Sequence, residues 1–137
     1  MKKFEGYIDQ NNQQPIKLKI LIAEDDAGME FLLSEIVAEH SRELLIARNG
    51  AEAVKICQSN SDIDLILMDV RMPLMDGYEA TAEIRKFNNN VIIIAQTSYV
   101  DSSETKKTIE VGCNECLSKP ISSDILDEVI RKYFEEY

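Results

Sequence analysis

One acidic residue stands where an apolar core residue is expected. The run Leu65 to Met68 has the composition of a buried strand, but it ends on Asp69, and Pro73 and Gly77 then break the pattern. A carboxylate removed from water costs several kcal/mol unless a cation, a hydrogen bond or a raised pKa compensates for it. We therefore expect other groups of the chain to meet Asp69.

Polar residues also follow three of the other apolar runs. They are Glu24, Asp25 and Asp26 after the first run, Thr97 and Ser98 after the fourth, and Lys119 and Pro120 after the fifth. Carboxylates that converge from two strands repel each other unless a hard divalent cation lies between them. Oxygen ligands of this kind suit Mg²⁺. With an ammonium and a hydroxyl aimed at the same point, the composition is that of a phosphoryl-transfer site.

Each residue type has a role in such a site. Asp69 would be the nucleophile and would form an aspartyl phosphate. Asp25 would ligate Mg²⁺ directly, and Glu24 would do so through water. Lys119 would pair with one phosphoryl oxygen, and Thr97 would hydrogen-bond another.

The elements that must position these residues alternate along the chain. Apolar runs typical of buried strands cover residues 19–23, 43–47, 64–68, 91–95 and 115–118. Helical patterns cover residues 27–40, 51–58, 78–87, 101–112 and 122 to the end. This alternation indicates a parallel sheet with helices on both faces, in which ligands bind at the carboxyl ends of the strands.

Two of the helices carry more specific expectations. The apolar stripe of the first is Met29, Leu32, Leu33, Ile36 and Val37, which predicts a helix packed on the core. The fourth offers only Ile109 and Val111 as clear apolar anchors before Gly112, so we expect it to be the loosest helix. Ser122 or Ser123 is expected to cap the fifth.

Composition bounds the class of protein. The 137 residues are 45% hydrophobic without a run long enough to span a membrane, which predicts one domain with a sizeable core. The start has no apolar stretch typical of a secretory signal, so the cytoplasm is expected. A formal charge of −10 disfavours direct nucleic-acid binding. Residues 1–17, polar and aperiodic, are predicted to be a linker or disordered tail before a domain over residues 18–137.

The remaining reactive residues have simpler interpretations. The chain has three cysteines, which we expect to be reduced, and Cys113 and Cys116 form a C-x-x-C pair. A redox pair of this type opens a helix, whereas this one leads into a strand, and a zinc site lacks a second ligand pair. His40, the one histidine, is expected to end the first helix as a polar residue.

Four ordered motifs resemble one known family. "ILIAEDD", "LILMDVRMPLMDG", "IIIAQTS" and "LSKPIS" are similar, in this order and spacing, to the receiver domain of two-component response regulators. The resemblance covers roughly Leu18 to Tyr137, and the sequence around Asp69 is most similar to receivers of hybrid histidine kinases. It implies a flavodoxin-like, five-stranded parallel sheet in the order 2-1-3-4-5.

The resemblance also implies a function. A histidine kinase, or the kinase module of the same chain, would pass a phosphoryl group from a phosphohistidine to Asp69, with Mg²⁺ also bound by the backbone carbonyl of Arg71. The domain would have no activity beyond self-phosphotransfer and slow autodephosphorylation. A switch in the face formed by the fourth helix, fifth strand and fifth helix would favour a homodimer or a downstream phosphotransfer protein.

Two details follow from the same resemblance. A cis peptide bond is implied at Lys119-Pro120. Receivers usually have Tyr or Phe at the position of Cys116, so switching is expected to rely on residues 97–99 and the fourth helix, with Tyr99 as an alternative moving aromatic.

Three alternatives remain open on the residues alone. An aspartate-nucleophile phosphatase would carry a second Asp at position 71, where this chain has Arg71. A flavin-binding domain would need small residues in place of Glu24 to Asp26. A receiver that docks partners without phosphorylation would not need the full set of site residues. No DNA-binding segment follows Tyr137, so we expect a free-standing receiver or a module of a larger chain.

Overall fold

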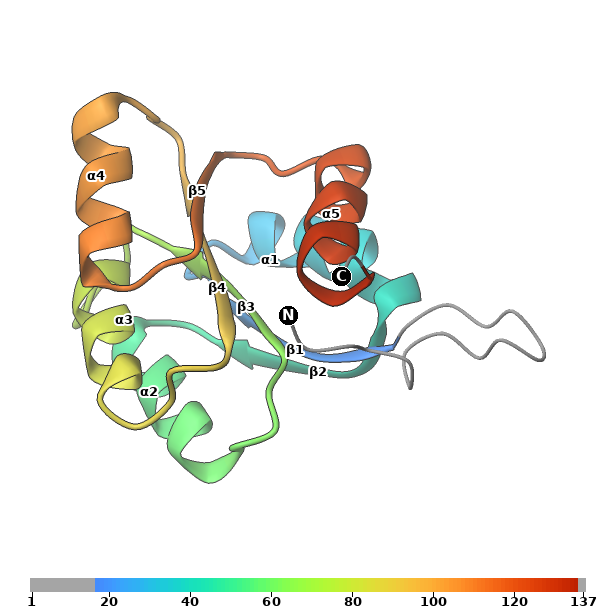
Figure 1. Ribbon diagram of the computed structural model, residues 1–137, viewed down its shortest axis with the longest axis horizontal. Coiled ribbons are helices and arrows are strands. Elements are labelled where there is room, and N and C mark those ends of the chain that lie inside the picture. Colours follow the sequence, from blue (N-terminus) through green and yellow to red (C-terminus); the bar gives the residue numbers. More distant parts are fainter. Residues whose placement is uncertain (1–16, 136–137) are drawn as a thin grey trace.

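Five parallel strands form one sheet in the order β2-β1-β3-β4-β5, which is the order that the family resemblance implies. The computed structural model describes residues 17–135. The strands are β1 (Leu18–Ala23), β2 (Ser41–Ala47), β3 (Leu65–Asp69), β4 (Ile92–Thr97) and β5 (Glu115–Ser118). The three central strands, β1, β3 and β4, are almost wholly buried, because helices cover both faces of the sheet (Figure 1). The edge strands β2 and β5 are partly exposed.

Five helices alternate with the strands. They are α1 (Ala27–Val37), α2 (Gly50–Ser59), α3 (Gly77–Arg85), α4 (Ser102–Val111) and α5 (Ser123–Ile130), with a 3₁₀ turn η2 (Ala38–His40) after α1 and a π-helical turn η3 (Arg131–Glu135) after α5. Each α-helix begins at a polar side chain that accepts a hydrogen bond from the backbone N–H three residues later; the caps are Asp26, Asn49, Asp76, Asp101 and Ser122. The predicted cap at Ser122 is confirmed.

The core divides into two clusters, one on each face of the sheet. One cluster joins the sheet to α2 and α3 through residues such as Ala53 and Ile84. The other joins the opposite face to α1, α5 and η3 through Leu33, Leu126 and Phe134. Figure 1 shows α2, α3 and α4 on one side and α1 and α5 on the other. The carboxyl ends of the strands lie between these two layers, which places any site there at the edge of a rigid core.

The apolar stripe predicted for the first helix is partly wrong. Leu33 and Val37 are fully buried, but Leu32 is 40% exposed. Leu32 lies about 100° around the helix from Leu33, and α1 buries a narrower face than five apolar residues suggest. The helix also stops at Val37, and the last predicted turn is the 3₁₀ turn that ends at His40.

Of the two anchors predicted for the fourth helix, Val111 packs against the core, but Ile109 does not. Ile109 is 47% exposed, whereas the buried side chains of α4 are Glu104 and Thr108. The helix packs through the polar side chain of Glu104 because Arg71 and Tyr78 supply hydrogen-bond donors to it. Gly112 ends α4 in the left-handed conformation (φ 118°), as expected of a helix stop.

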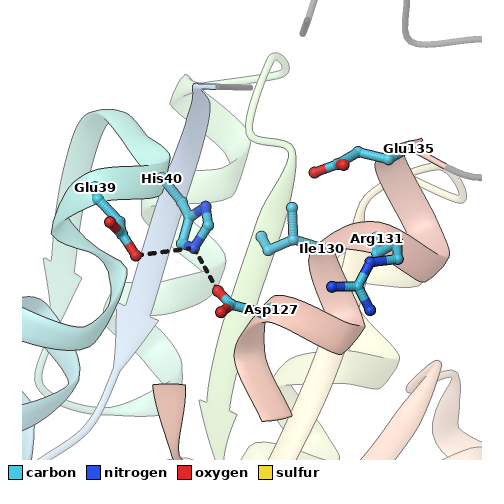
Figure 2. A pocket seen from close by; sticks show the side chains of 6 residues that line it. All are labelled: Glu39, His40, Asp127, Ile130, Arg131 and Glu135. Atoms are coloured by element: carbon cyan, nitrogen blue, oxygen red, sulfur yellow. Dashed lines mark hydrogen bonds and ion pairs between the residues drawn. The ribbon is translucent and has the colours of Figure 1, made fainter. Parts of the chain in front are cut away.

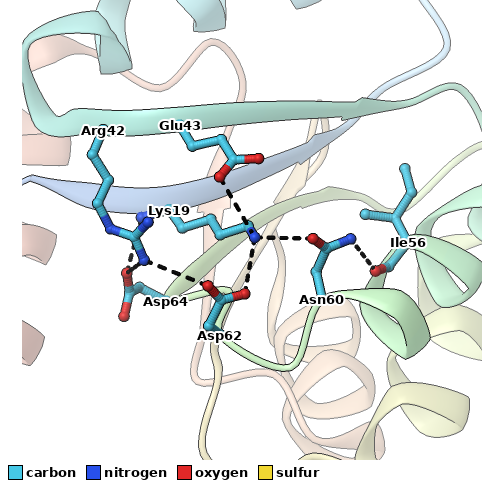
Figure 3. A network of polar contacts seen from close by, with 7 residues as sticks. All are labelled: Lys19, Arg42, Glu43, Ile56, Asn60, Asp62 and Asp64. Carbon is cyan, nitrogen blue, oxygen red and sulfur yellow. Dashed lines mark hydrogen bonds and ion pairs between the residues drawn. The ribbon is translucent and has the colours of Figure 1, made fainter.

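Two polar contacts fasten the edges of the domain. His40 at the end of η2 lies 2.9 Å from Asp127 of α5, in agreement with its predicted place at the end of the first helix (Figure 2). Lys19, predicted as an ordinary strand residue, is buried at the opposite edge from the site, where its ammonium contacts Asn60 and Asp62 at 2.9 Å each (Figure 3). Pairing with Asp62 raises the pKa of Lys19 despite its burial.

The predicted linker, residues 1–17, lies almost wholly outside the described residues, and it stays a prediction. Within residues 17–135, no helix is both long and apolar enough to cross a membrane.

Candidate functional site

Three carboxylates meet at the carboxyl edge of the sheet. Ala23 of β1 pairs with Met68 of β3, so Glu24 and Asp69, the next residues, stand side by side. Oxygens of Glu24, Asp25 and Asp69 lie within 4.8 Å of one another, with Glu24 and Asp69 buried and Asp25 exposed. Asp69 is the last residue of its strand rather than the first one past it, because β3 continues to pair with β4 there. The sequence therefore brings together the acids predicted to meet.

Lys119 lies between two of these acids. Its ammonium is 2.9 Å from Glu24 Oε1 and 3.0 Å from Asp69 Oδ1. Burial alone would lower the pKa of Lys119, but pairing with Glu24 and Asp69 outweighs burial, and the pKa is raised. The lysine is therefore a fixed positive charge beside the buried carboxylate of Asp69. The Lys119-Pro120 bond is cis, as expected.

The pKa of Glu24 is raised, although two neighbouring groups act to lower it. Burial raises its pKa, and neither the ammonium of Lys119 nor the backbone N–H of Asp26 fully offsets this. Oε1 of Glu24 contacts the Lys119 ammonium at 2.9 Å, and Oε2 accepts the Asp26 N–H at 3.1 Å. A buried carboxylate whose pKa stays raised despite these contacts is a position where a further cation would be favourable.

The third acid after β1 has a different task. Asp26 Oδ2 accepts a hydrogen bond from the Met29 backbone N–H at 2.8 Å and so caps α1. Its own N–H donates to Glu24 Oε2 at 3.1 Å, which orients that side chain. Of the acidic triplet, only Glu24 and Asp25 are left to face Asp69.

Thr97 completes the edge on the next strand. Gln96 is the β4 partner of Asp69, so Thr97 lies one residue beyond it and, like Asp69, is the last residue of its strand. Thr97 is buried, and Tyr99 donates its backbone N–H to the Thr97 hydroxyl at 3.3 Å. The Lys119 N–H donates to the Thr97 carbonyl at 2.9 Å, which ties the two predicted phosphoryl contacts together.

The loop after Asp69 folds back on it. The Arg71 backbone N–H donates to Asp69 Oδ1 at 3.3 Å. Gly77 starts α3 against the same backbone, since a Cβ there would lie 2.3 Å from the Asp69 carbonyl oxygen. Only glycine permits this approach. Arg71 is thus beside Asp69, and the role of its backbone carbonyl as a metal ligand stays a prediction.

A polar network around the buried Glu104 extends from this loop to α4. The Arg71 guanidinium is 3.2 Å from Glu104, and the Tyr78 hydroxyl donates to the other oxygen of the same carboxylate. Lys107 of α4 lies 4.1 Å above the Tyr78 ring. Sequence reasoning missed this network, since an acid on a polar helix, a tyrosine in the first turn of another and an arginine in a loop give no pattern that joins them.

Cys116 lies on β5 near α4. It is half-buried, a free thiol, and faces Thr108 and Thr105; burial raises its pKa. Cys113 is buried, with its sulfur 3.6 Å from the Thr81 hydroxyl, and its pKa is raised to about 11 by burial. Neither thiol has the low pKa of a redox centre, which agrees with the interpretation of the C-x-x-C pair from sequence.

The family is decided by comparison with known proteins. Residues 20–131 match the response regulator receiver domain family. The chain belongs to this family. Receiver domains are components of two-component signalling, and the five-stranded order of this receiver is the flavodoxin-like order predicted from its motifs.

Its relatives are of two kinds. Hybrid signal transduction histidine kinase I of Dictyostelium discoideum is 32% identical over 96% of this chain but only 8% of its own length, and hybrid kinase B of the same organism is 37% identical over 84% and 6%. This receiver therefore spans less than a tenth of these curated relatives. The chemotaxis protein CheY of Halobacterium salinarum is similar in size, with 35% identity over 82% of this chain and 92% of its own length.

Solved structures share the fold. The receiver domain of Saccharomyces cerevisiae Ssk1, crystallised with the histidine phosphotransfer protein Ypd1, superposes with a TM-score of 0.79 at 30% identity and covers 85% of this chain and 88% of its own. A Borrelia burgdorferi CheX–CheY complex with BeF₃ and Mg²⁺ gives a TM-score of 0.80 at 23% identity, over 97% of this chain and all of that one, which supports the fold.

Proposed function

We propose that this receiver takes a phosphoryl group from a phosphohistidine onto Asp69 in a reaction that requires Mg²⁺. The observation that carries the proposal is the Lys119 ammonium, 2.9 Å from Glu24 and 3.0 Å from the buried Asp69. Glu24 and Asp69 are both buried and both contact this ammonium, but only Asp69 pairs with the strand that ends at the buried Thr97.

The transfer is a displacement at phosphorus. An Asp69 carboxylate oxygen forms the new P–O bond while the P–N bond of the donor phosphohistidine breaks, and the imidazole leaves with the bonding electron pair. Lys119 neutralises charge on one phosphoryl oxygen, and the Thr97 hydroxyl donates to another. Asp69 is freed for attack when Lys119 exchanges its contact with the carboxylate for one with the phosphoryl group.

The acidic cluster fits a magnesium ion. Three carboxylates stand together beside the ammonium of Lys119, and the pKa of the buried Glu24 stays raised despite that contact, so a further cation would be favourable. Asp25 and Asp69 would hold the ion directly, together with the backbone carbonyl of Arg71, and Glu24 would hold it through water. When bound, Mg²⁺ neutralises the carboxylates and the charge that develops on the phosphoryl group.

The donor is a histidine kinase or the kinase module of a longer chain, and a histidine phosphotransfer protein is a further partner. The phosphorylated histidine of the donor must reach the carboxyl edge of the sheet, so the surface that contacts the donor surrounds that edge. Exposed apolar side chains lie on the elements that leave it: Phe31 (65% exposed) on α1 and Leu74 (87%) in the loop after Asp69. These are the residues expected to contact the donor.

Phosphorylation would change the face formed by α4, β5 and α5. Helix α4 is held by the Glu104 carboxylate rather than by an apolar stripe, and Arg71 connects that carboxylate to the loop after Asp69. A change of charge at Asp69 therefore acts on a helix with few apolar contacts. A second copy of the receiver, forming a homodimer, or a downstream phosphotransfer protein would recognise the altered face. The receiver, residues 18–137, would act in the cytoplasm, and residues 1–17 would be its linker.

A small phosphodonor such as acetyl phosphate distinguishes this proposal from the phosphatase alternative. We expect at most one phosphoryl group per chain in the presence of Mg²⁺, with slow release of phosphate. Sustained turnover at a constant rate would instead indicate an enzyme. The Arg71 guanidinium, which stands where a phosphatase has its acid, pairs with Glu104 and cannot transfer a proton at neutral pH.

A further inference from the structure

A second cluster of metal-ligating side chains lies far from the sheet edge, between η2 and α5. His40 and Glu39 come from the 3₁₀ turn and Asp127 comes from α5 (Figure 2). They line a pocket of about 240 Å³ together with Ile130, Arg131 and Glu135. The phosphoryl site uses none of these residues.

The three side chains already have the spacing of metal ligands. His40 Nε2 is 2.9 Å from Asp127 Oδ1 and 3.7 Å from Glu39 Oε1, and one ligand atom from each residue lies within 4.8 Å of the others. Ligands about 2.0–2.1 Å from a tetrahedral Zn²⁺ are roughly 3.3–3.4 Å apart, between the two measured contacts. Small side-chain movements are therefore sufficient to surround an ion.

The chemistry of the set selects the kind of ion. One imidazole with two carboxylates is a ligand set for borderline metals such as Zn²⁺, whereas Mg²⁺ and Ca²⁺ prefer oxygen alone. Figure 2 shows the imidazole edge turned toward both carboxylates, with Glu135 at the rim. The fourth position is left to water, since Glu135 is not among the residues within 4.8 Å.

The local charge also favours a cation. Three carboxylates, of Glu39, Asp127 and Glu135, line the pocket against one guanidinium, that of Arg131. Lys17 contacts the Glu39 backbone carbonyl rather than its carboxylate. Both basic side chains are exposed and are screened by water, whereas His40 is largely buried.

We propose that Glu39, His40 and Asp127 form a binding site for a borderline divalent cation, with Zn²⁺ as the representative ion. The bound ion joins η2, through Glu39 and His40, to α5, through Asp127. Because α5 belongs to the face proposed to switch, occupancy holds that helix against α1.

The test uses the ring of the single histidine as its reporter. The untagged chain, with Cys116→Ser to remove the half-buried thiol, is titrated with ZnCl₂ near pH 7.5 in excess Mg²⁺, and the ¹⁵N resonances of the His40 ring are recorded. We expect the Nε2 resonance to shift until one equivalent is bound. Asp127→Asn should weaken binding by at least the ~10-fold that loss of an outer-shell partner costs.

Glu128→Gln is the matched control, since it removes one negative charge from an exposed position on the same helix. We expect it to change affinity less than twofold. A His40 ring unmoved by Zn²⁺, or equal losses in Asp127→Asn and Glu128→Gln, would mean that the carboxylates attract ions only through their general charge, and the site would be rejected. His40→Gln, tested for Zn²⁺ binding by calorimetry, should lose the one-equivalent transition; its retention would also overturn the proposal.

Discussion

The hydroxyl of Tyr78 donates a hydrogen bond to the carboxylate of Glu104 beneath α4. Glu104 also pairs with Arg71, so a single buried carboxylate joins the loop after Asp69, the first turn of α3 and helix α4. Receivers usually have an aromatic ring at the position of Cys116. In this chain the buried ring under α4 is that of Tyr78, whose pKa burial and Glu104 both raise.

Tyr78→Phe tests the contribution of this hydrogen bond to stability. The change leaves a buried carboxylate with one fewer donor, so we expect a loss of about 1–3 kcal/mol in the free energy of unfolding. Denaturant titration at neutral pH measures it. Tyr99→Phe is the control, because Tyr99 is 69% exposed and should lose almost nothing. Equal effects from the two substitutions would show that the contact with Glu104 is unimportant.

Cys116→Ala tests whether residue 116 transmits the signal. The thiol fills space beside Thr105 and Thr108, and an alanine removes only one atom. We expect phosphorylation and the accompanying NMR shifts over residues 98–111 to be retained. Tyr99→Ala, by contrast, should diminish those shifts, since Tyr99 follows the buried Thr97 directly and its backbone N–H contacts the Thr97 hydroxyl. The assignment is wrong if Cys116→Ala loses the shifts while Asp69 is still labelled.

The two lysines of α4 should differ when their charges are reversed. Lys106 is exposed to solvent, whereas Lys107 lies over the Tyr78 ring. We expect Lys106→Glu to weaken binding of a phosphorylation-dependent partner and to leave stability unchanged. Lys107→Glu should weaken binding and also lower stability by about 0.5–1 kcal/mol, the usual value of an exposed cation–π contact. Pull-down and thermal unfolding separate the two effects, and unchanged binding in Lys106→Glu would refute this placement of the surface.

Glu24→Gln should reveal the cost of the buried acid. Its pKa is raised above the ordinary value of 4.5, so the folded protein holds more protons than the unfolded chain in the interval above that value. The stability that the protonated carboxyl contributes is complete below pH 4.5 and is lost as the pH rises through the raised pKa.

We therefore expect metal-free Glu24→Gln to be more stable than the wild type at pH 7, with the two curves converging toward pH 4.5. Its phosphorylation should meanwhile require more Mg²⁺. Urea unfolding in EDTA across this pH range checks the first expectation, and Glu128→Gln on the exposed face of α5 serves as control. A wild type that gains stability over the variant as the pH rises would reverse the sign of the argument.

The family resemblance implied the sheet order, whereas the parallel sheet and the members of the site follow from patterns along the chain. Buried strands read as apolar runs, and polar residues that end them must meet where parallel strands end. The polar anchors of α4 could not be predicted in this way. Its buried residues are polar, and Glu104 is paired with groups 26 and 33 positions away, which no local period records.

Lys19 was missed for the same reason. A lysine at the start of an apolar run appears exposed until Asn60 and Asp62 are seen to surround its ammonium. The metal-ligating set of Glu39, His40 and Asp127 likewise needs the packing of α5 against the end of the first helix before its members are neighbours.

The most direct test of the account is the location of the phosphoryl group after reaction with acetyl phosphate. Peptide mapping by mass spectrometry should place it on Asp69, only when Mg²⁺ is present. Asp69→Asn should remove the label, and Asp76→Asn, a capping acid in the same loop, should retain it. Lys119→Met should slow labelling without moving it. Labelling of Asp69→Asn at the wild-type rate, or of the wild type in EDTA, would contradict the account.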